Sequence, residues 1–462
     1  MYPVSQAETL AQTAYRNALR DADTRRKREA ARMLDYFCDA QLGYIKAQLA
    51  RERQEPERYN PIFFNIVKKI IKNVSQVYLQ DAVRVVDGGG QSDTDIYAEI
   101  ENTAQLPSKM KTANRYTTLL GTIMLRPVWR GGKMDLDIYA PDVLDVETGD
   151  TPEDVIAVMV THDRSGKNEE IEYDLWTAEE YARLDYRGYA LESEPNPYGV
   201  IPFIPVFSHT PTDSVWLTGA ADLMAAQDEI SRRMTALSFT ADLQGFGVAV
   251  AKGATGRDGK APDLNFGPGQ YLGLPEGADF GFESPNAPIG DMINLVDFIA
   301  KQAAVSNGLS ASSMSVNPTQ ESGISKLVGN AELEERRRDQ IAIFARVEQR
   351  LFEMFRIVWN VHNPQRQMSA AATLRVDFFD PKPVLSGTEQ AKEWDLLLDR
   401  GLISPVDIMI ERNPDLTREE AKARLLEIRA EIKEYGDSAK DFTPSFGDFP
   451  GIPNDFNPAN QA

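Results

Sequence analysis

Cysteine, histidine and long apolar runs are scarce in this 462-residue sequence. Cys38 is the only cysteine, and the three histidines, His162, His209 and His362, lie far apart. A single cysteine forms no intrachain disulfide, which favours a reducing compartment, and this set cannot supply a structural zinc site of the usual spacing. No run of about 18 apolar residues is present, so we expect no membrane-spanning helix. Residues 1–30 lack the apolar core of a signal peptide.

The sequence also lacks the motifs of nucleotide-dependent and hydrolytic enzymes. The segment Gly253-Ala-Thr-Gly-Arg-Asp-Gly-Lys-Ala261 comes nearest to a phosphate-binding loop, but its spacing is off by one residue and Ala261 replaces the hydroxyl that binds magnesium. Gly267-Pro-Gly-Gln-Tyr-Leu-Gly273 has the wrong spacing for a dinucleotide fingerprint, and no G-x-S-x-G elbow occurs. We therefore expect no enzyme, no cofactor and no metal.

Acidic side chains outnumber basic ones by 70 to 50, which gives a formal net charge of −20. Such a chain is a poor candidate for wrapping duplex DNA or lying on an anionic membrane. The clearest basic run is Arg25-Arg26-Lys27-Arg28. It fits a solvated helix face, and a contact with nucleic acid or a partner is the alternative.

Isolated candidates for chemistry have simple structural interpretations. His162 and His209 lie in polar sequence and are expected at the surface, whereas His362 closes a long helix, where a cation favours the helix dipole. Cys38 is expected to be packed on a helix.

The first half of the chain mixes helices with short strands. Residues 5–55 are typical of one or two exposed helices, and Asn60-Pro61 begins an amphipathic helix whose apolar face reaches Tyr78. Further patterns predict a strand at 83–86, helix at 94–120, and strands at 122–129, 134–139, 155–161, 170–176 and 189–191. Three prolines in Asn196–Phe207 predict an edge strand or an extended crossing segment.

The second half is dominated by long helices. Helices at 219–244 and 291–307 flank a Gly-rich insert at 246–290, which predicts an antiparallel stalk with a small knob at its tip. The apolar stripe of the second helix includes Ile293, Val296, Ile299 and Ala303. After a polar linker come the longest helix, from near Ile324 toward Asn360, a strand at 374–379, helices at 389–399, 404–411 and 417–435, and a tail of 25 residues. The fold class is mixed α+β.

The order of these segments, together with several short motifs, resembles the portal (head–tail connector) proteins of tailed bacteriophages. The most specific motif is Asn196-Pro-Tyr-Gly-Val-Ile-Pro-Phe-Ile-Pro205, which is similar to the family's segment entering the stem. Leu120-Gly-Thr-Ile-Met-Leu-Arg-Pro127, Tyr139-Ala-Pro-Asp-Val143 and Asp399-Arg-Gly-Leu-Ile-Ser404 are also similar. The resemblance covers roughly residues 55–435.

The resemblance implies a portal fold with named parts. Residues 1–210 and 325–385 would form a β-rich wing with a long helix and a returning strand, and 219–245 and 291–309 the two stem helices. Residues 246–290 would form the clip, 310–324 the tunnel loop, 386–435 a helical crown, and 436–462 a flexible tail.

Function follows from the same resemblance: a non-enzymatic ring of about twelve subunits at one capsid vertex, through which double-stranded DNA passes with weak, sequence-independent contacts. Implied partners are the terminase large subunit, head-completion or adaptor proteins, and major capsid and scaffolding proteins, with the chain in the virion and, during assembly, in the host cytoplasm. The alternatives are a monomeric virion adaptor or scaffold-type protein without a channel and, further off, a nucleotide-dependent hydrolase.

Candidate site residues are assigned by segment, because none is fixed by a motif. The tunnel loop offers Asn317, Thr319, Gln320, Glu321 and Lys326 as channel-lining residues. The stem offers Arg232, Arg233 and Lys301, each of which also fits a solvated or salt-bridged helix charge. The clip offers Lys252, Arg257, Asp258, Lys260, Asp263 and Tyr271 for partner binding.

Overall fold

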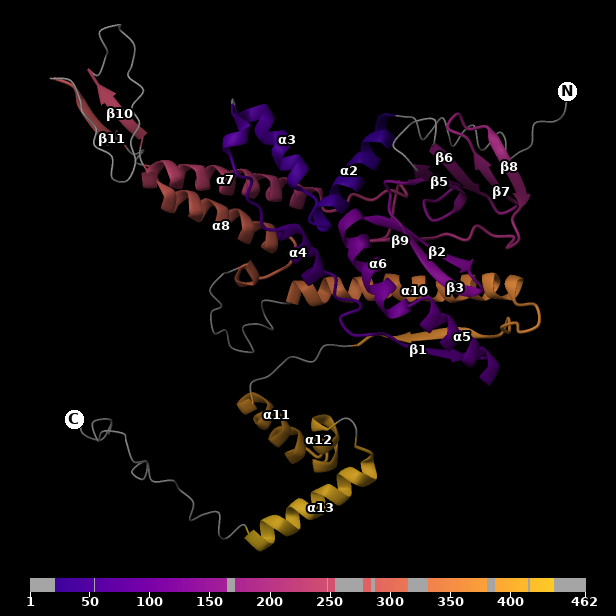
Figure 1. Ribbon diagram of the computed structural model, residues 1–462. Coiled ribbons are helices and arrows are strands. Elements are labelled where there is room, and N and C mark those ends of the chain that lie inside the picture. Colours follow the sequence, from indigo (N-terminus) through magenta and orange to yellow (C-terminus); the bar gives the residue numbers. More distant parts are fainter. Residues whose placement is uncertain are drawn as a thin grey trace, which may run out of the picture. The chain divides into compact units, whose positions relative to one another are not determined.

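A computed structural model describes residues 21–53, 55–163, 171–246, 248–253, 277–283, 287–314, 331–379, 387–413 and 416–435 (Figure 1). The chain divides into two compact units, Met1–Pro381 and Lys382–Ala462. Helices and antiparallel sheets alternate in the first unit, and the second is helical, so the mixed α+β class is confirmed.

The helices of the first unit follow the predicted order. Their bounds are α2 Asp21–Phe37, α3 Leu42–Glu52, α4 Ile66–Val74, α5 Gln91–Thr103, α6 Leu106–Leu120, α7 Ala221–Phe246, α8 Ile289–Val305 and α10 Ala331–His362, with short 3-10 turns at Pro56–Arg58 and Ala311–Met314. The expected start of the longest helix near Ile324 lies outside the described residues. None of the helices in the described ranges is long and apolar enough to cross a membrane.

The described residues of the first unit also form four antiparallel sheets, one of which pairs β10 (Val248–Lys252) with β11 (Asp279–Glu283). Strand β2 (Thr122–Arg130) lies between β3 (Lys133–Tyr139) and β9 (Ile204–Phe207), and β1 (Val83–Asp87) pairs with β12 (Thr373–Asp377). A five-stranded sheet runs in sequence order through β4 (Leu144–Thr148), β5 (Val155–Asp163), β6 (Ile171–Trp176), β7 (Glu180–Leu184) and β8 (Ala190–Pro195). The Pro-rich segment thus supplies an edge strand, as predicted, whereas β4 and β7 were not predicted.

The main core forms around α10. Phe344, Leu351, Phe355 and Val358 recur on one face of this helix and are buried. They belong to one continuous apolar cluster with residues of α4, α5 and α6, such as Ile70, Ile96 and Met110. The removal of this apolar surface from water is the main force that holds these elements together.

One ion pair crosses this core. The Arg84 guanidinium on β1 donates two hydrogen bonds to the Glu348 carboxylate on α10, at 3.0 and 2.7 Å, and both side chains are fully buried. The Tyr78 hydroxyl donates to the same carboxylate at 2.7 Å, and Glu101 accepts from Arg84 at 2.8 Å. Burial of two charges is tolerated here because each is hydrogen-bonded by a charged partner.

The N-terminal helices are not exposed, contrary to expectation. Ala30, Met33 and Tyr36 of α2 and Ile45 and Leu49 of α3 are buried. Helix α2 touches α4, α6 and α7, so one face of it completes the core of the first unit. These helices contain few apolar residues, so the sequence pattern did not reveal that the few form one narrow buried stripe on an otherwise charged surface.

The basic run of α2 is divided between two environments. Arg25 pairs with Glu29 at the surface, and Arg28 is likewise exposed. Arg26 and Lys27 instead form ion pairs with Asp145 on β4, and the Arg26 guanidinium lies 3.9 Å from the centre of the Trp216 ring. Two of the four cations therefore fix α2 to the five-stranded sheet, which neither sequence interpretation anticipated.

Helix α4 begins five residues later than Pro61. The Asn65 side chain accepts a hydrogen bond from the Lys68 backbone N–H at 2.8 Å and caps the helix. The segment before it stays extended because α7 binds its backbone: Thr235 accepts from Ile62 N–H at 3.0 Å and Gln227 from Ile66 N–H at 2.8 Å. Tertiary hydrogen bonds thus outweigh the proline signal.

The expectation for Cys38 was wrong, whereas the position expected for His362 at the end of a long helix is confirmed. Cys38 is exposed, because α2 ends at Phe37 and the next residue but one, Asp39, turns the chain with φ 67°. His362 stacks on Trp129 with 5.4 Å between ring centres, and burial lowers its pKa. His362 is the last residue of α10, as expected, and the loss of hydration disfavours its charged form.

The described residues of the second unit form three helices, α11 (Gly387–Asp399), α12 (Pro405–Arg412) and α13 (Arg418–Tyr435). The expected capping box is present: the Glu420 carboxylate accepts from the Thr417 backbone N–H at 2.9 Å and from its hydroxyl at 2.7 Å. Of the apolar side chains described in this unit, Ala421 alone is fully buried. The three helices therefore enclose little core by themselves.

Candidate assembly surface

The predicted stalk is present as helices α7 and α8, which lie side by side and carry the strand pair β10 (Val248–Lys252) and β11 (Asp279–Glu283) (Figure 1). Its root is fixed by two glycines. Gly121 ends α6 with φ 82°, and Gly219 lies directly against the Leu119 carbonyl, where a Cβ atom would clash. The Ala220 N–H then donates to that carbonyl at 2.8 Å, so α7 begins on the end of α6.

Helix α7 is held by the first unit over its N-terminal half. Leu223 and Ile230 of the expected stripe are buried, and so is a polar seam of Gln227, Ser231 and Thr235. Further along, Ala241 of the same stripe is exposed. The distal half of α7 therefore leaves the core, and α8 is the helix that contacts it most.

Helix α8 presents apolar side chains to solvent. It is anchored through Ala303 and Ala304, which are buried. Its other face exposes Phe298 by 61%, Val305 by 46% and Leu295 by 39%. We call this set the α8 apolar face. Ile293 lies on the same side of the helix as Ala300 and the buried Ala304, as expected, but it is 51% exposed near the start of α8.

The stem candidates Arg232, Arg233 and Lys301 form salt bridges, in agreement with the alternative interpretation as salt-bridged helix charges. Glu229 accepts hydrogen bonds from Arg232 at 3.0 Å and Arg233 at 2.7 Å, and Lys301 pairs with Asp297 at 2.6 Å. Partial burial alone would raise the pKa of Glu229, but the hydrogen bonds from the two guanidinium groups outweigh it and lower that pKa. These cations are compensated within their own helices, so none is an isolated anion-binding group.

Only part of the segment between α7 and α8 lies within the described residues, and this part includes the strand pair β10–β11. Lys252 forms an ion pair with Glu283 at 3.5 Å, and Phe282 is exposed next to Phe280, with 5.3 Å between the rings. The remaining candidates of the clip and the tunnel loop lie outside the described residues: Arg257, Asp258, Lys260, Asp263, Tyr271, Asn317, Thr319, Gln320, Glu321 and Lys326.

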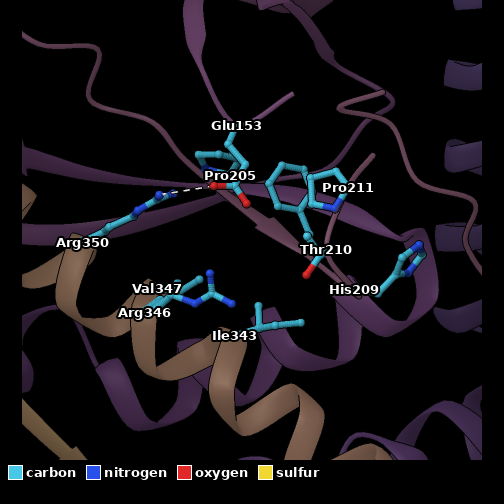
Figure 2. A pocket seen from close by; sticks show the side chains of 10 residues that line it. Glu153, Pro205, His209, Thr210, Pro211, Ile343, Arg346, Val347 and Arg350 are labelled. Atoms are coloured by element: carbon cyan, nitrogen blue, oxygen red, sulfur yellow. Dashed lines mark ion pairs between the residues drawn. The ribbon is translucent and has the colours of Figure 1, made fainter. Parts of the chain in front are cut away.

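A small cavity lies between α10 and the segment around β9 (Figure 2). Its volume is about 30 Å³, and it lies beside the ion pair of Arg350 with Glu153, whose charged atoms are 3.5 Å apart. Space for about one water molecule cannot hold a substrate. The cavity therefore gives no support to a catalytic site.

A larger, basic groove of about 700 Å³ lies at the root of α7. Arg336, Arg338 and Arg346 of α10 line it, opposite Asp222 in the first turn of α7. Burial lowers the pKa of Arg336, and Asp222 works in the opposite direction. The Arg336-Arg337-Arg338 run was a signal for this groove that the sequence interpretation missed.

The exposed apolar side chains of α8 suit association with a partner. Among the described residues, no group of three or more His, Cys, Asp or Glu side chains could hold a metal ion. The feature of α7 and α8 that calls for a partner is the α8 apolar face. Its sequence signal was six apolar residues among the eight from Met292 to Ile299, which is too many for a single buried stripe.

Comparison with known proteins found similar solved chains and a matching family model. Three solved chains share 12–14% sequence identity with the protein: one described as the virion of a native gene transfer agent particle, one as the neck of the native particle computed with C12 symmetry, and one as the neck of the empty particle computed with C6 symmetry. TM-scores are 0.40, 0.42 and 0.43, and coverage is 79%, 75% and 75% of this chain and 92%, 89% and 89% of those chains. No curated protein matches the sequence.

A family model provides the assignment. The model of the phage portal proteins of the SPP1 Gp6-like type matches residues 17–435. This match includes α2 and α3, which lie outside the region where the sequence motifs suggested a resemblance. Since it spans most of the chain, the protein belongs to the SPP1 Gp6-like family of phage portal proteins, a family of structural proteins.

Proposed function

We propose that this portal protein acts as a closed ring of about twelve subunits, with α7 and α8 of each subunit forming the stem around a channel for double-stranded DNA. The observation that carries the proposal is the α8 apolar face. Contiguous exposed apolar area is unfavourable in water and marks an association surface. Because this face is on a helix that belongs to the stalk, we place the subunit contact there.

A ring requires one surface of a subunit to meet a different surface of the next at a fixed rotation. The α8 apolar face supplies one side of such a heterologous contact. Heterologous contacts that fail to close give filaments, so a ring makes a definite prediction about the size of the assembly.

The charge distribution supports a conduit that DNA can slide through. The chain carries a net charge of −20, and the stem cations Arg232, Arg233 and Lys301 are neutralised by acidic neighbours. Each phosphate that a protein neutralises adds salt-dependent affinity, so a lumen with few free cations binds the duplex weakly and without regard to sequence. The tunnel loop, residues 310–324, remains our candidate for the narrowest contact.

Partner docking is assigned by segment. Residues 246–290, at the end of the two stem helices, are the clip and would bind the terminase large subunit and later the head-completion or adaptor proteins. The wing, residues 1–210 and 325–385, would meet the major capsid and scaffolding proteins, with residues 386–435 as the crown. The ring would stand at the portal vertex of the virion after assembly in the host cytoplasm.

The first test is the native mass of the purified chain. About twelve copies of 51.5 kDa weigh roughly 620 kDa, and negative-stain images should show a hollow ring. A protein that stays monomeric at high concentration and in the presence of scaffolding protein would contradict the ring and favour the monomeric adaptor.

The α8 apolar face is tested by a pair of variants. Phe298→Glu places a charge at the most exposed aromatic residue of this face and should prevent ring formation, whereas Phe298→Leu keeps the site apolar and should assemble like the wild type. Circular dichroism controls for folding. Normal rings of Phe298→Glu would show that the subunit contact lies elsewhere.

A further inference from the structure

The C-terminal 22 residues contain a repeat that the portal assignment does not explain. Asp441-Phe-Thr-Pro-Ser-Phe-Gly447, Asp448-Phe-Pro-Gly-Ile-Pro-Asn454 and Asp455-Phe-Asn-Pro-Ala-Asn-Gln461 follow one another without a gap. Each begins with Asp-Phe and has a proline one or two residues after the phenylalanine. A seven-residue period suits a coiled coil, but a proline in every repeat is incompatible with a continuous helix. The repeat therefore offers three separate Asp-Phe anchors.

The second unit contains a groove of matching chemistry. A space of about 780 Å³ lies between α12 and α13, mostly lined by apolar side chains. Ile408 and Met409 of α12 and Leu425 and Ile428 of α13 face it and are only half-buried. A groove of this size and lining accepts an aromatic side chain.

The rim of the groove carries one cation without a carboxylate partner among the described residues. Arg424 is paired with Glu427 at 2.8 Å, and Glu420 is bound to the backbone of Thr417. Arg412, by contrast, is exposed and lies over the Trp394 ring at 5.3 Å. Residues 436–462 contain four aspartates and one lysine, so the tail and this rim have opposite charge.

The connection is short enough for the chain's own tail to reach the groove. Helix α13 ends at Tyr435, which is roughly 10–15 Å along the helix axis from Leu425 and Ile428 at 1.5 Å per residue. The six residues that end at Asp441 span up to about 20 Å when extended. The apolar stripe of α13 continues from the groove through Ile432, which is 63% exposed, toward the start of the tail.

We propose that the C-terminal Asp-Phe repeat docks on the α12–α13 groove of its own chain, with a phenylalanine ring between the two helices and the adjacent aspartate at Arg412. A short tether gives an effective concentration of about millimolar, so even a weak anchor is occupied, and three equivalent anchors raise that occupancy. The tail thereby covers apolar area that the three helices alone leave exposed. This inference concerns the second unit alone and does not rest on the ring or the channel.

Hydrogen exchange of the full chain tests the docking. The variant Phe442→Ala/Phe449→Ala/Phe456→Ala should exchange the amides of residues 405–428 about tenfold faster than the wild type. The matched control, Asn454→Ala/Asn457→Ala/Asn460→Ala, changes the same tail without touching the anchors and should exchange like the wild type. Equal protection in all three proteins would overturn the proposal, because the groove would then be covered without the repeat.

A cross-link identifies which chain supplies the tail. In a Cys38→Ser background, Met409→Cys and Phe442→Cys should form a disulfide within one chain upon mild oxidation. Chains labelled with nitrogen-14 and nitrogen-15 are mixed before assembly, and the linked peptides are then weighed. Links of a single isotope support docking within the chain, whereas mixed-isotope links would place the tail of a second copy in the groove and overturn it. If Met409→Cys forms no disulfide with Phe442→Cys but does form one with Asp437→Cys, the position proposed for the tail along the groove would also be contradicted.

Discussion

Glu348 and Arg84 show at the scale of single residues how the core depends on a compensated charge. Both are fully buried, and their bidentate pair is completed by the Tyr78 hydroxyl. Glu348→Gln removes the fully buried carboxylate and leaves the guanidinium with Glu101 as its remaining carboxylate partner, so it should destabilise the fold by about 3 kcal/mol. Arg84→Met/Glu348→Leu removes both charges and should cost less than either single change. Urea unfolding followed by tryptophan fluorescence measures both, and additive losses in the double variant would contradict the coupling.

Tyr78, which belongs to the same buried site, should make the stability of the fold depend on pH in alkaline solution. Burial, and then the charge of Glu348, raise its pKa well above the ordinary value of 10. Above pH 10 the unfolded chain loses a proton that the folded chain keeps, so stability is fully present below about pH 10 and falls as pH rises. Tyr78→Phe should flatten this decline in urea midpoint between about pH 9 and 11. Tyr189→Phe, at an exposed tyrosine, should leave the slope unchanged, and an unchanged slope in Tyr78→Phe would refute the assignment.

At the scale of elements, hydrophobic periodicity identified the long helices and strands that bury one face. Helices α7 and α8, the end of α10 and the strand β2 were predicted within a few residues, because each keeps one pattern over several turns or pairs. Strands β4 and β7 were missed because five residues with mixed polarity carry little pattern of their own. The extended start before α4 was missed because its cause, hydrogen bonds to Gln227 and Thr235, is more than 150 residues away in sequence.

The attachment of α2 to the five-stranded sheet gives a prediction at this scale. Asp145 on β4 binds both Arg26 and Lys27, and each of the three side chains is mostly buried. Asp145→Asn leaves two mostly buried cations without this counter-charge, which should destabilise the contact by about 1–3 kcal/mol and speed amide exchange in residues 21–37. Glu29→Gln removes only the exposed pair with Arg25 and should change exchange little. Equal effects of the two variants would argue against the attachment.

For the whole molecule, the order of segments along the chain was more informative than any motif, since portal proteins have no catalytic signature to find. The paired charges of the stem were predictable, because Glu229 and Asp297 stand three or four residues from their cations. The excess of apolar residues on α8 was visible in the sequence but their exposure was not, because helical periodicity tells which residues share a face but not whether a neighbour covers it. That information belongs to the tertiary structure, and we propose that a neighbouring subunit covers the face in the ring.

Net charge at this scale sets how the proposed ring should respond to salt. Each chain carries −20, so bringing about twelve together adds repulsion that ions screen over about 10 Å at 0.1 M. The contact proposed on α8 is apolar, so its binding free energy does not weaken when charges are screened. Raising sodium chloride from about 0.05 to 0.5 M should therefore lower the concentration at which rings form, severalfold by analytical ultracentrifugation. Rings that dissociate as salt rises would show that ion pairs between subunits, rather than the α8 apolar face, hold the assembly together.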